Sequence, residues 1–152
     1  MATTTQPEIP SANVDAWTGA EGRIDGRPSL LRFRPGLAHY LGDVRFSRRL
    51  QVTWTYEDDG SGGMPSDKDS DAMQLLEDRL VSSLEAAQAG VLAFVFTHGG
   101  NREWHIYVND SDDLGEVINE ALSNLPGLPI DLAIEDDPEW TELSSVMQSV
   151  RA

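Results

Sequence analysis

The sequence predicts an α+β domain in which two helices cover one face of an antiparallel sheet. Apolar residues repeat at period two over residues 50–56 and 104–108, the spacing of half-buried strands. They repeat at helical spacing over residues 73–84 and 114–122. Glycine or proline separates several of these segments. From residue 48 the predicted order is strand, helix, strand, strand, helix, strand, which is the ferredoxin-like βαββαβ plan.

The 152 residues suffice for one hydrophobic core, so we expect a single domain over residues 14–152. Residues 1–13 are mostly threonine, proline and serine, with little to bury, and read as a flexible leader. Within the domain we expect an N-terminal hairpin extension (17–47), the ferredoxin-like core (48–135) and a C-terminal helix (136–152).

The hairpin extension rests on a turn signal followed by a short alternating segment. Asp25-Gly26-Arg27-Pro28 has turn chemistry, and apolar residues alternate with arginine over residues 29–34. An uncovered sheet edge is open to aberrant pairing, so we expect this hairpin to extend or cover an edge of the core sheet.

The core elements follow from local composition. Residues 57–70 predict an acidic loop, and the first helix is expected to begin near Asp71, with Gln74 completing a capping-box-like pair. Residues 91–96 form a continuous apolar run, which is typical of a strand covered on both faces. The partner strand, residues 102–108, should place Trp104, Ile106 and Val108 on one face and Glu103, His105 and Tyr107 on the other.

The C-terminal third predicts a helix over the apolar positions of residues 114–122, a last strand over 129–134 and a helix over 141–150. We expect Asp136 or Asp137 to cap the final helix and Trp140 to hold it against the body of the domain.

Negative charge is distributed unevenly along the chain. Residues 1–56 contain seven arginines and five acids, whereas residues 57–152 contain 21 acids and four basic residues. The net charge of −15 argues against direct binding of nucleic acid, which needs clustered lysine and arginine. The arginine-rich first third keeps RNA binding open as a small alternative.

The composition argues against several classes of protein. No window approaches the ~18 apolar residues that a membrane span needs. The chain has no cysteine, which excludes thiolate metal sites and thiol catalysis and suits a cytoplasmic protein. We therefore expect a cytoplasmic protein that binds no membrane and carries no cofactor and no metal.

Three acidic or polar motifs have some of the chemistry of a functional site. Asp67, Asp69 and Asp71 have the spacing of a calcium loop, but Ala72 stands where that loop needs glycine. The acids of residues 135–139 have the chemistry of an acid/base pair, but a proline-containing turn favours solvated carboxylates. The serine in residues 60–63 lacks the context of a catalytic elbow. We therefore expect no catalytic residues.

The chain resembles a bacterial family of uncharacterised proteins, domain of unknown function 695, over roughly residues 17–142. The matching pieces are Gly26-Arg27-Pro28-Ser29, Trp54-Thr55-Tyr56, Met64-Pro65, Leu76-Glu77-Asp78, the segment from Thr97 to Trp104 with Tyr107, and Asp137-Pro138-Glu139-Trp140. The family has no agreed activity, so the resemblance carries over no functional residues. Its βαββαβ pattern is similar to that of the inhibitor of ribonuclease E called regulator B, which is an analogy of fold alone.

Two hypotheses about function follow. The first is a non-enzymatic protein whose acidic surface binds a basic protein, such as a nuclease or toxin. Its candidate residues are the acids near the first helix and after the last strand: Asp58, Asp59, Asp67, Asp69, Glu135, Asp136, Asp137 and Glu139. The alternative is an enzyme or a module that binds a small anion between the hairpin and the sheet. Its candidate residues are Arg32, Arg34, Arg102, Trp104, His105 and Tyr107.

Overall fold

The computed structural model describes residues 16–57, 64–110, 112–123, 125 and 127–151. The expected leader (1–13) and the glycine–serine segment (60–63) lie outside the described residues. Along the chain the elements are β1 (Thr18–Ile24), β2 (Arg27–Phe33), the 3-10 helix η1 (Pro35–Tyr40), β3 (Arg48–Thr55), α1 (Asp67–Ala86), β4 (Gly90–His98), β5 (Asn101–Val108), α2 (Leu114–Leu122), β6 (Ile130–Asp136) and α3 (Thr141–Arg151).

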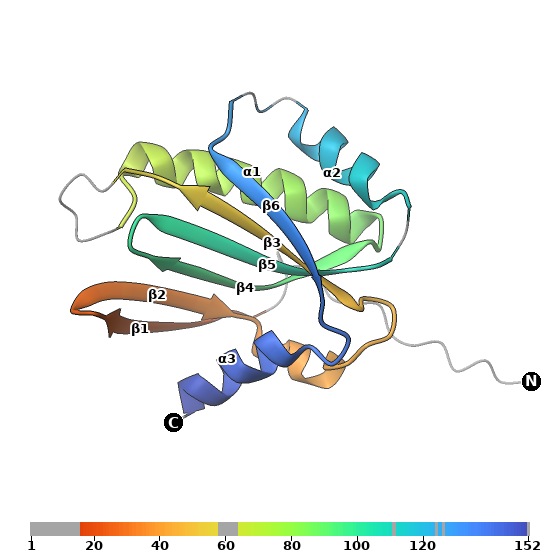
Figure 1. Cartoon of the computed structure of the whole chain (residues 1–152), viewed down its shortest axis with the longest axis horizontal. Coiled ribbons are helices and arrows are strands. Elements are labelled where there is room, and N and C mark those ends of the chain that lie inside the picture. Colours follow the sequence, from red (N-terminus) through yellow and green to blue (C-terminus); the bar gives the residue numbers. More distant parts are fainter. Residues whose placement is uncertain (1–15, 58–63, 111, 124, 126, 152) are drawn as a thin grey trace, which may run out of the picture.

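The described strands form one six-stranded sheet with the order β1-β2-β4-β5-β3-β6. Every neighbouring pair is antiparallel, which confirms the predicted α+β class with an antiparallel sheet. β1 and β2 are joined by a two-residue turn, Asp25-Gly26, in which both residues have positive φ, as twisted two-residue hairpins require. β2 pairs with β4, so β1 and β6 are the two edges of the sheet (Figure 1).

Helices cover both faces of the sheet. α1 and α2 pack on one face over a core that includes Leu50 and Trp104, as the sequence predicts. α3 covers the opposite face, where Trp140 and Leu143 pack with Leu37 of η1. α1 and α2 therefore share one face, as predicted, and α3, whose face the sequence analysis did not assign, covers the other. The reason is the apolar run of β4, which presents Val91, Ala93 and Phe94 to the α3 side.

Two boundaries differ from those the sequence predicts. α1 begins at Asp67, four residues before the expected start, because the Ser66 side chain caps it by accepting a hydrogen bond of 3.2 Å from the Asp69 amide. β6 continues to Asp136, so Glu135 and Asp136 lie in the strand, opposite Arg49 and Arg48 of β3, and not in a turn. The predicted starts of α2 and α3, at residues 114 and 141, are confirmed.

Candidate functional site

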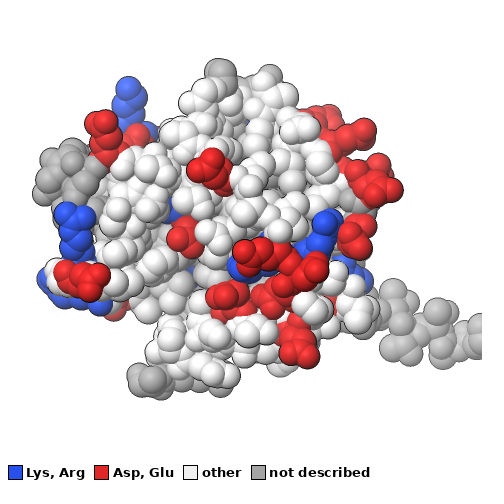
Figure 2. Space-filling view, in the orientation of Figure 1, with Lys and Arg blue, Asp and Glu red and all other residues white. Residues whose placement is uncertain are grey.

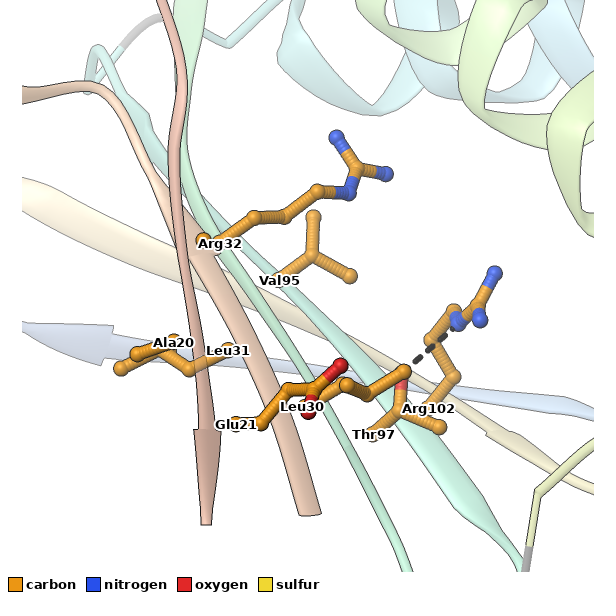
Figure 3. Close-up of a pocket in the computed structure, with 9 residues that line it drawn as sticks. Ala20, Glu21, Leu30, Leu31, Arg32, Val95, Thr97 and Arg102 are labelled. Carbon is orange, nitrogen blue, oxygen red and sulfur yellow. Dashed lines mark hydrogen bonds between the residues drawn. The ribbon is translucent and has the colours of Figure 1, made fainter.

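A pocket lies on the α1 face of the sheet, where β1 and β2 extend beyond α1. Cross-strand neighbours share a face, so the pairings define two rows of side chains across β1, β2, β4 and β5. The first row contains Glu21, Leu30, Thr97 and Arg102. The second row contains Gly19, Arg32, Val95 and Trp104. Members of both rows line a cavity of about 470 Å³, which we call the hairpin pocket (Figure 3).

Arg32 is held at the α1 side of this pocket. Its guanidinium forms an ion pair with Glu77 of α1, and the Glu77 carboxylate also accepts a 2.9 Å hydrogen bond from the Trp104 indole. The Arg32 guanidinium carbon lies 4.9 Å from the centre of the Trp17 ring, within the range of a cation–π contact. Glu77 and Trp17 therefore fix where Arg32 places its charge.

Arg102 enters the same pocket from β5. Its Nε donates a 2.9 Å hydrogen bond to Oγ1 of Thr97, and its guanidinium extends from the sheet on the same side as that of Arg32 (Figure 3). Burial lowers the pKa of Arg102, and the nearby positive charge of Arg32 lowers it further. A cation in such surroundings gains from an anionic neighbour.

The six residues of the anion hypothesis do not form one site. Arg32, Arg102 and Trp104 come together at Glu77 and the hairpin pocket. Arg34 shares their face but is completely buried, bonded to Glu85 of α1 and to the Leu92 carbonyl. His105 and Tyr107 lie on the opposite face of β5, because successive strand residues alternate between faces.

His105 belongs to a buried polar cluster on the α3 face. Its ring stacks on Phe94 at 4.1 Å, its Nε2 lies 2.9 Å from the Glu103 carboxylate, and its Nδ1 lies 3.4 Å from the Arg49 guanidinium. Arg49 in turn donates to Glu135 of β6 at 3.0 Å. The cluster joins three adjacent strands by charge-assisted hydrogen bonds.

Asp137 and Tyr107 form a second cluster beside it. The Asp137 carboxylate accepts hydrogen bonds from the Tyr107 hydroxyl at 2.7 Å and from the amides of Thr141 and Glu142 at the start of α3. This confirms Asp137 as the cap of α3. Asp137 is only 8 % exposed, so it is not one of the surface carboxylates. Burial raises the pKa of Tyr107 well above its usual value, and its hydrogen bond to Asp137 adds to the shift.

The remaining acids of the protein-binding hypothesis fall into separate groups. Asp67 and Asp69 occupy the first turn of α1, and Asp58 and Asp59 lie outside the described residues. Glu135, Asp136 and Glu139 are exposed at the end of β6 and the turn after it. Figure 2 shows carboxylates gathered where β6 leads into α3, at a distance from the start of α1 in Figure 1.

The exposure of β6 is the feature that the sequence analysis missed. Leu132 and Ile134 are 47 % and 43 % exposed, although they share a face with buried Val52 and Leu50 of the neighbouring strand. Asp131 and Glu135 alternate with them on the other face and are also exposed. We call residues 130–136 with Glu139 the β6 edge. The alternation of apolar and acidic residues from 130 to 135 is a signal of a half-exposed edge strand that sequence analysis can use.

Within the part of the chain that the structure describes, no helix has the length and apolar content needed to cross a membrane. Over the same residues, no three histidine, aspartate or glutamate side chains gather as metal ligands would. Neither the comparison with curated proteins nor the comparison with solved structures found a match. The model of a family of unknown function, DUF695, matches residues 15–144, which include every strand and both clusters described above. The chain therefore belongs to the DUF695 family.

Proposed function

We propose that this protein is a non-enzymatic binding protein that receives an extended, basic segment of a partner protein along the β6 edge. The observation that carries the proposal is an open sheet edge with exposed apolar side chains and acidic neighbours. Among the described strands β6 pairs with β3 alone, so alternate backbone N–H and C=O groups on its other side face no described strand. Adding a strand to such an edge is a common way to bind a peptide.

The side chains of β6 specify the chemistry of the incoming strand. Leu132 and Ile134 offer apolar contact on the α1 face. Asp131 offers negative charge on the other face, where Glu135 is paired with Arg49, and Asp136 and Glu139 add negative charge at one end. A strand in which apolar and basic residues alternate would match both faces, because opposite charges and apolar pairs across strands are favourable.

A second copy of this chain matches the edge poorly. If two β6 strands paired antiparallel about Ala133, Asp131 of each copy would lie opposite Glu135 of the other. Like charges directly opposite one another destabilise a strand pair. The partner is therefore a different, basic protein. A nuclease or toxin with a basic nucleic-acid groove has the required charge. Because the chain has no cysteine, we propose that the two proteins bind in the cytoplasm.

The other edge of the sheet is a weaker candidate. β1 contains Gly19 and Gly22, and glycine weakens a strand. It carries both an acid, Glu21, and a base, Arg23, so it selects neither charge. Of the two edge strands that the structure describes, β6 alone combines exposed apolar residues with a single sign of charge.

We infer further that the core follows the ferredoxin-like plan. The order β4-β5-β3-β6, with α1 and α2 as the connections that cross the sheet, supports this inference. On this plan the last strand lies at an edge of the sheet, and the β1–β2 hairpin blocks only the opposite edge. The hairpin extension thereby directs strand addition to β6.

The experiment is a titration of the full chain with a synthetic peptide of alternating valine and lysine, followed by calorimetry at low salt. A peptide of the same composition with its lysines grouped together serves as the sequence control. We expect the alternating peptide to bind at least tenfold more tightly than the grouped one, and both to weaken as salt rises. Equal affinity for the two peptides would show attraction by charge alone and would contradict the proposal.

Matched variants locate the binding surface. Asp131→Asn with Asp136→Asn should weaken peptide binding about five- to tenfold, because both carboxylates flank the docked strand. Asp67→Asn with Asp69→Asn removes the same charge at α1 and should change binding less than twofold. Leu132→Thr should also weaken binding, whereas Leu75→Gln, at an exposed leucine of α1, should not. Equal losses from the two charge pairs would overturn the assignment to β6.

A further inference from the structure

We propose that the hairpin pocket binds a small organic carboxylate with a single negative charge and an apolar body. This site is separate from the β6 edge, since β1, β2, β4 and β5 build it and β6 contributes no residue. The volume of about 470 Å³ lies within the range of small-molecule sites. The inference does not depend on the proposed protein partner.

The position of the pocket follows from the register of the strands. β2 carries Leu30 and Arg32 past the side of α1, and Gly19 lies opposite Arg32 on β1. Because glycine has no side chain, the second row ends in open space beside Arg32. Val95 and Thr97, which are both buried, form the floor of that space, and Leu30 is half-exposed at its side.

Arg102 supplies the group that binds the carboxylate. Its Nε is occupied by Thr97, which orients the guanidinium, and among the described residues no carboxylate forms an ion pair with it. The two terminal nitrogens therefore have donors to offer. A guanidinium binds a carboxylate through two parallel hydrogen bonds, and partial burial strengthens such a pair.

The charges around the pocket limit the ligand to one negative charge. Arg32 is paired with Glu77, whereas Arg102 forms no ion pair with any carboxylate of the described residues, so Arg102 is the cation that a ligand would pair with. Glu21 lines the same pocket and would repel a second negative charge on the ligand. A phosphate monoester, with nearly two charges at neutral pH, therefore fits less well than a monocarboxylate.

The aliphatic side chains of the pocket favour a ligand with an apolar body. Leu30 and Val95 present this surface on the α1 face, and their contact with a ligand would remove it from water. An aliphatic carboxylate of four to eight carbons combines the two properties. Its carboxylate would lie at Arg102 and its chain would lie along β2.

The test uses hexanoate as the probe, titrated into the full chain and followed by amide chemical shifts. Hexanol serves as the uncharged analogue and inorganic phosphate as the anion without an apolar body. We expect saturable shifts with hexanoate in residues of β1, β2 and β4, binding at least tenfold weaker with hexanol, and no saturable shifts with phosphate. Hexanol binding as tightly as hexanoate, or phosphate binding at the same residues, would overturn the proposal.

Variants separate the role of Arg102 from that of general charge. Arg102→Gln should weaken hexanoate binding at least tenfold, whereas Arg23→Gln, which removes an exposed arginine of β1 outside this pocket, should change it less than twofold. Gly19→Val tests the same site without touching Arg102. A Cβ at this position meets only the Leu31 carbonyl oxygen, at 3.9 Å, so the variant should fold and fill the pocket. If Gly19→Val binds hexanoate like the wild type, the pocket is not the site.

Discussion

The Tyr107 ring lies 4.2 Å from the Trp140 ring and within 5° of parallel to it. Tyr107 belongs to β5, and Trp140 immediately precedes α3, so this contact fixes where the C-terminal helix meets the sheet. The Trp140 indole donates a 2.8 Å hydrogen bond to the Phe46 carbonyl, which ties the same point to the segment before β3. Both rings are completely buried, and the arrangement explains why α3 covers the face that α1 and α2 leave open.

Tyr107→Phe should keep the ring stacking and remove the hydroxyl that donates to Asp137. The Asp137 carboxylate is buried and would lose one of its partners, which costs about 1–3 kcal/mol of unfolding free energy. Urea unfolding followed by circular dichroism measures the change. Tyr107→Leu, which also removes the stacking, should cost more, and equal stability of Tyr107→Phe and the wild type would contradict the role of the hydroxyl.

The raised pKa of Tyr107 predicts a loss of stability in alkali. An unfolded tyrosine ionises near pH 10, roughly its reference value, whereas the folded Tyr107 remains protonated at higher pH. The unfolded chain therefore loses this proton at a lower pH than the folded chain does. The contribution of Tyr107 to the unfolding free energy is complete below about pH 10 and declines as the pH rises above that value. The unfolding free energy of the wild type should fall more steeply than that of Tyr107→Phe between pH 9.5 and 11. Parallel curves would show that other groups cause the decline.

Gly90 is required where β4 begins beside β5. A Cβ at this position would lie 3.0 Å from Cγ1 of Val108 and 3.1 Å from the Tyr107 carbonyl oxygen. Gly90→Ala should therefore destabilise the protein by about 1–3 kcal/mol, as overpacking does. Gly115→Ala is the matched control, since a Cβ in α2 there meets nothing within 4 Å. The control should leave stability unchanged or raise it by up to about 1 kcal/mol, because alanine favours a helix. Equal effects of the two changes would contradict the close approach at Gly90.

Ser66→Ala should destabilise α1 by about 1 kcal/mol, because it removes the acceptor for the Asp69 amide. Asp71→Ala should have a much smaller effect, since Asp71 lies inside the helix. Thermal unfolding of the two variants compares the capping residue of the structure with the one that the sequence favours. A larger loss of stability from Asp71→Ala than from Ser66→Ala would contradict the start at Asp67 and support a helix that begins near Asp71.

Much of the fold follows from the sequence, because period-two and helical spacings are strong signals where one face is buried. The alternation through Trp104, Ile106 and Val108 places those residues correctly and puts His105 on the opposite face. The same alternation puts His105 and Arg102 on opposite faces of β5, so the six residues of the anion hypothesis cannot all line one pocket. The sequence does not locate the start of α1, because an acidic stretch resembles a loop and Ser66 is one of several residues there with capping chemistry.

The sites depend on contacts between residues far apart in the chain. The pairing of Arg32 with Glu77, and of Glu77 with Trp104, joins β2, α1 and β5 and has no local signal. The exposure of Leu132 and Ile134 depends on how far α1 and α2 extend over the sheet. The sequence is compatible with Asp137 as a helix cap or as a surface acid that binds a partner, and the burial of Asp137 in the structure favours the cap.

Pairing of a basic partner strand with β6 can be tested by amide hydrogen exchange. The exchange rates of the β6 amides are measured by nuclear magnetic resonance in the free chain and with a saturating amount of the alternating valine–lysine peptide. Alternate amides from Ile130 to Asp136 should become at least tenfold slower, because the docked strand accepts their hydrogen bonds. Exchange at β1 should not change. A saturated complex in which the β6 amides exchange as fast as in the free chain would contradict strand addition at this edge.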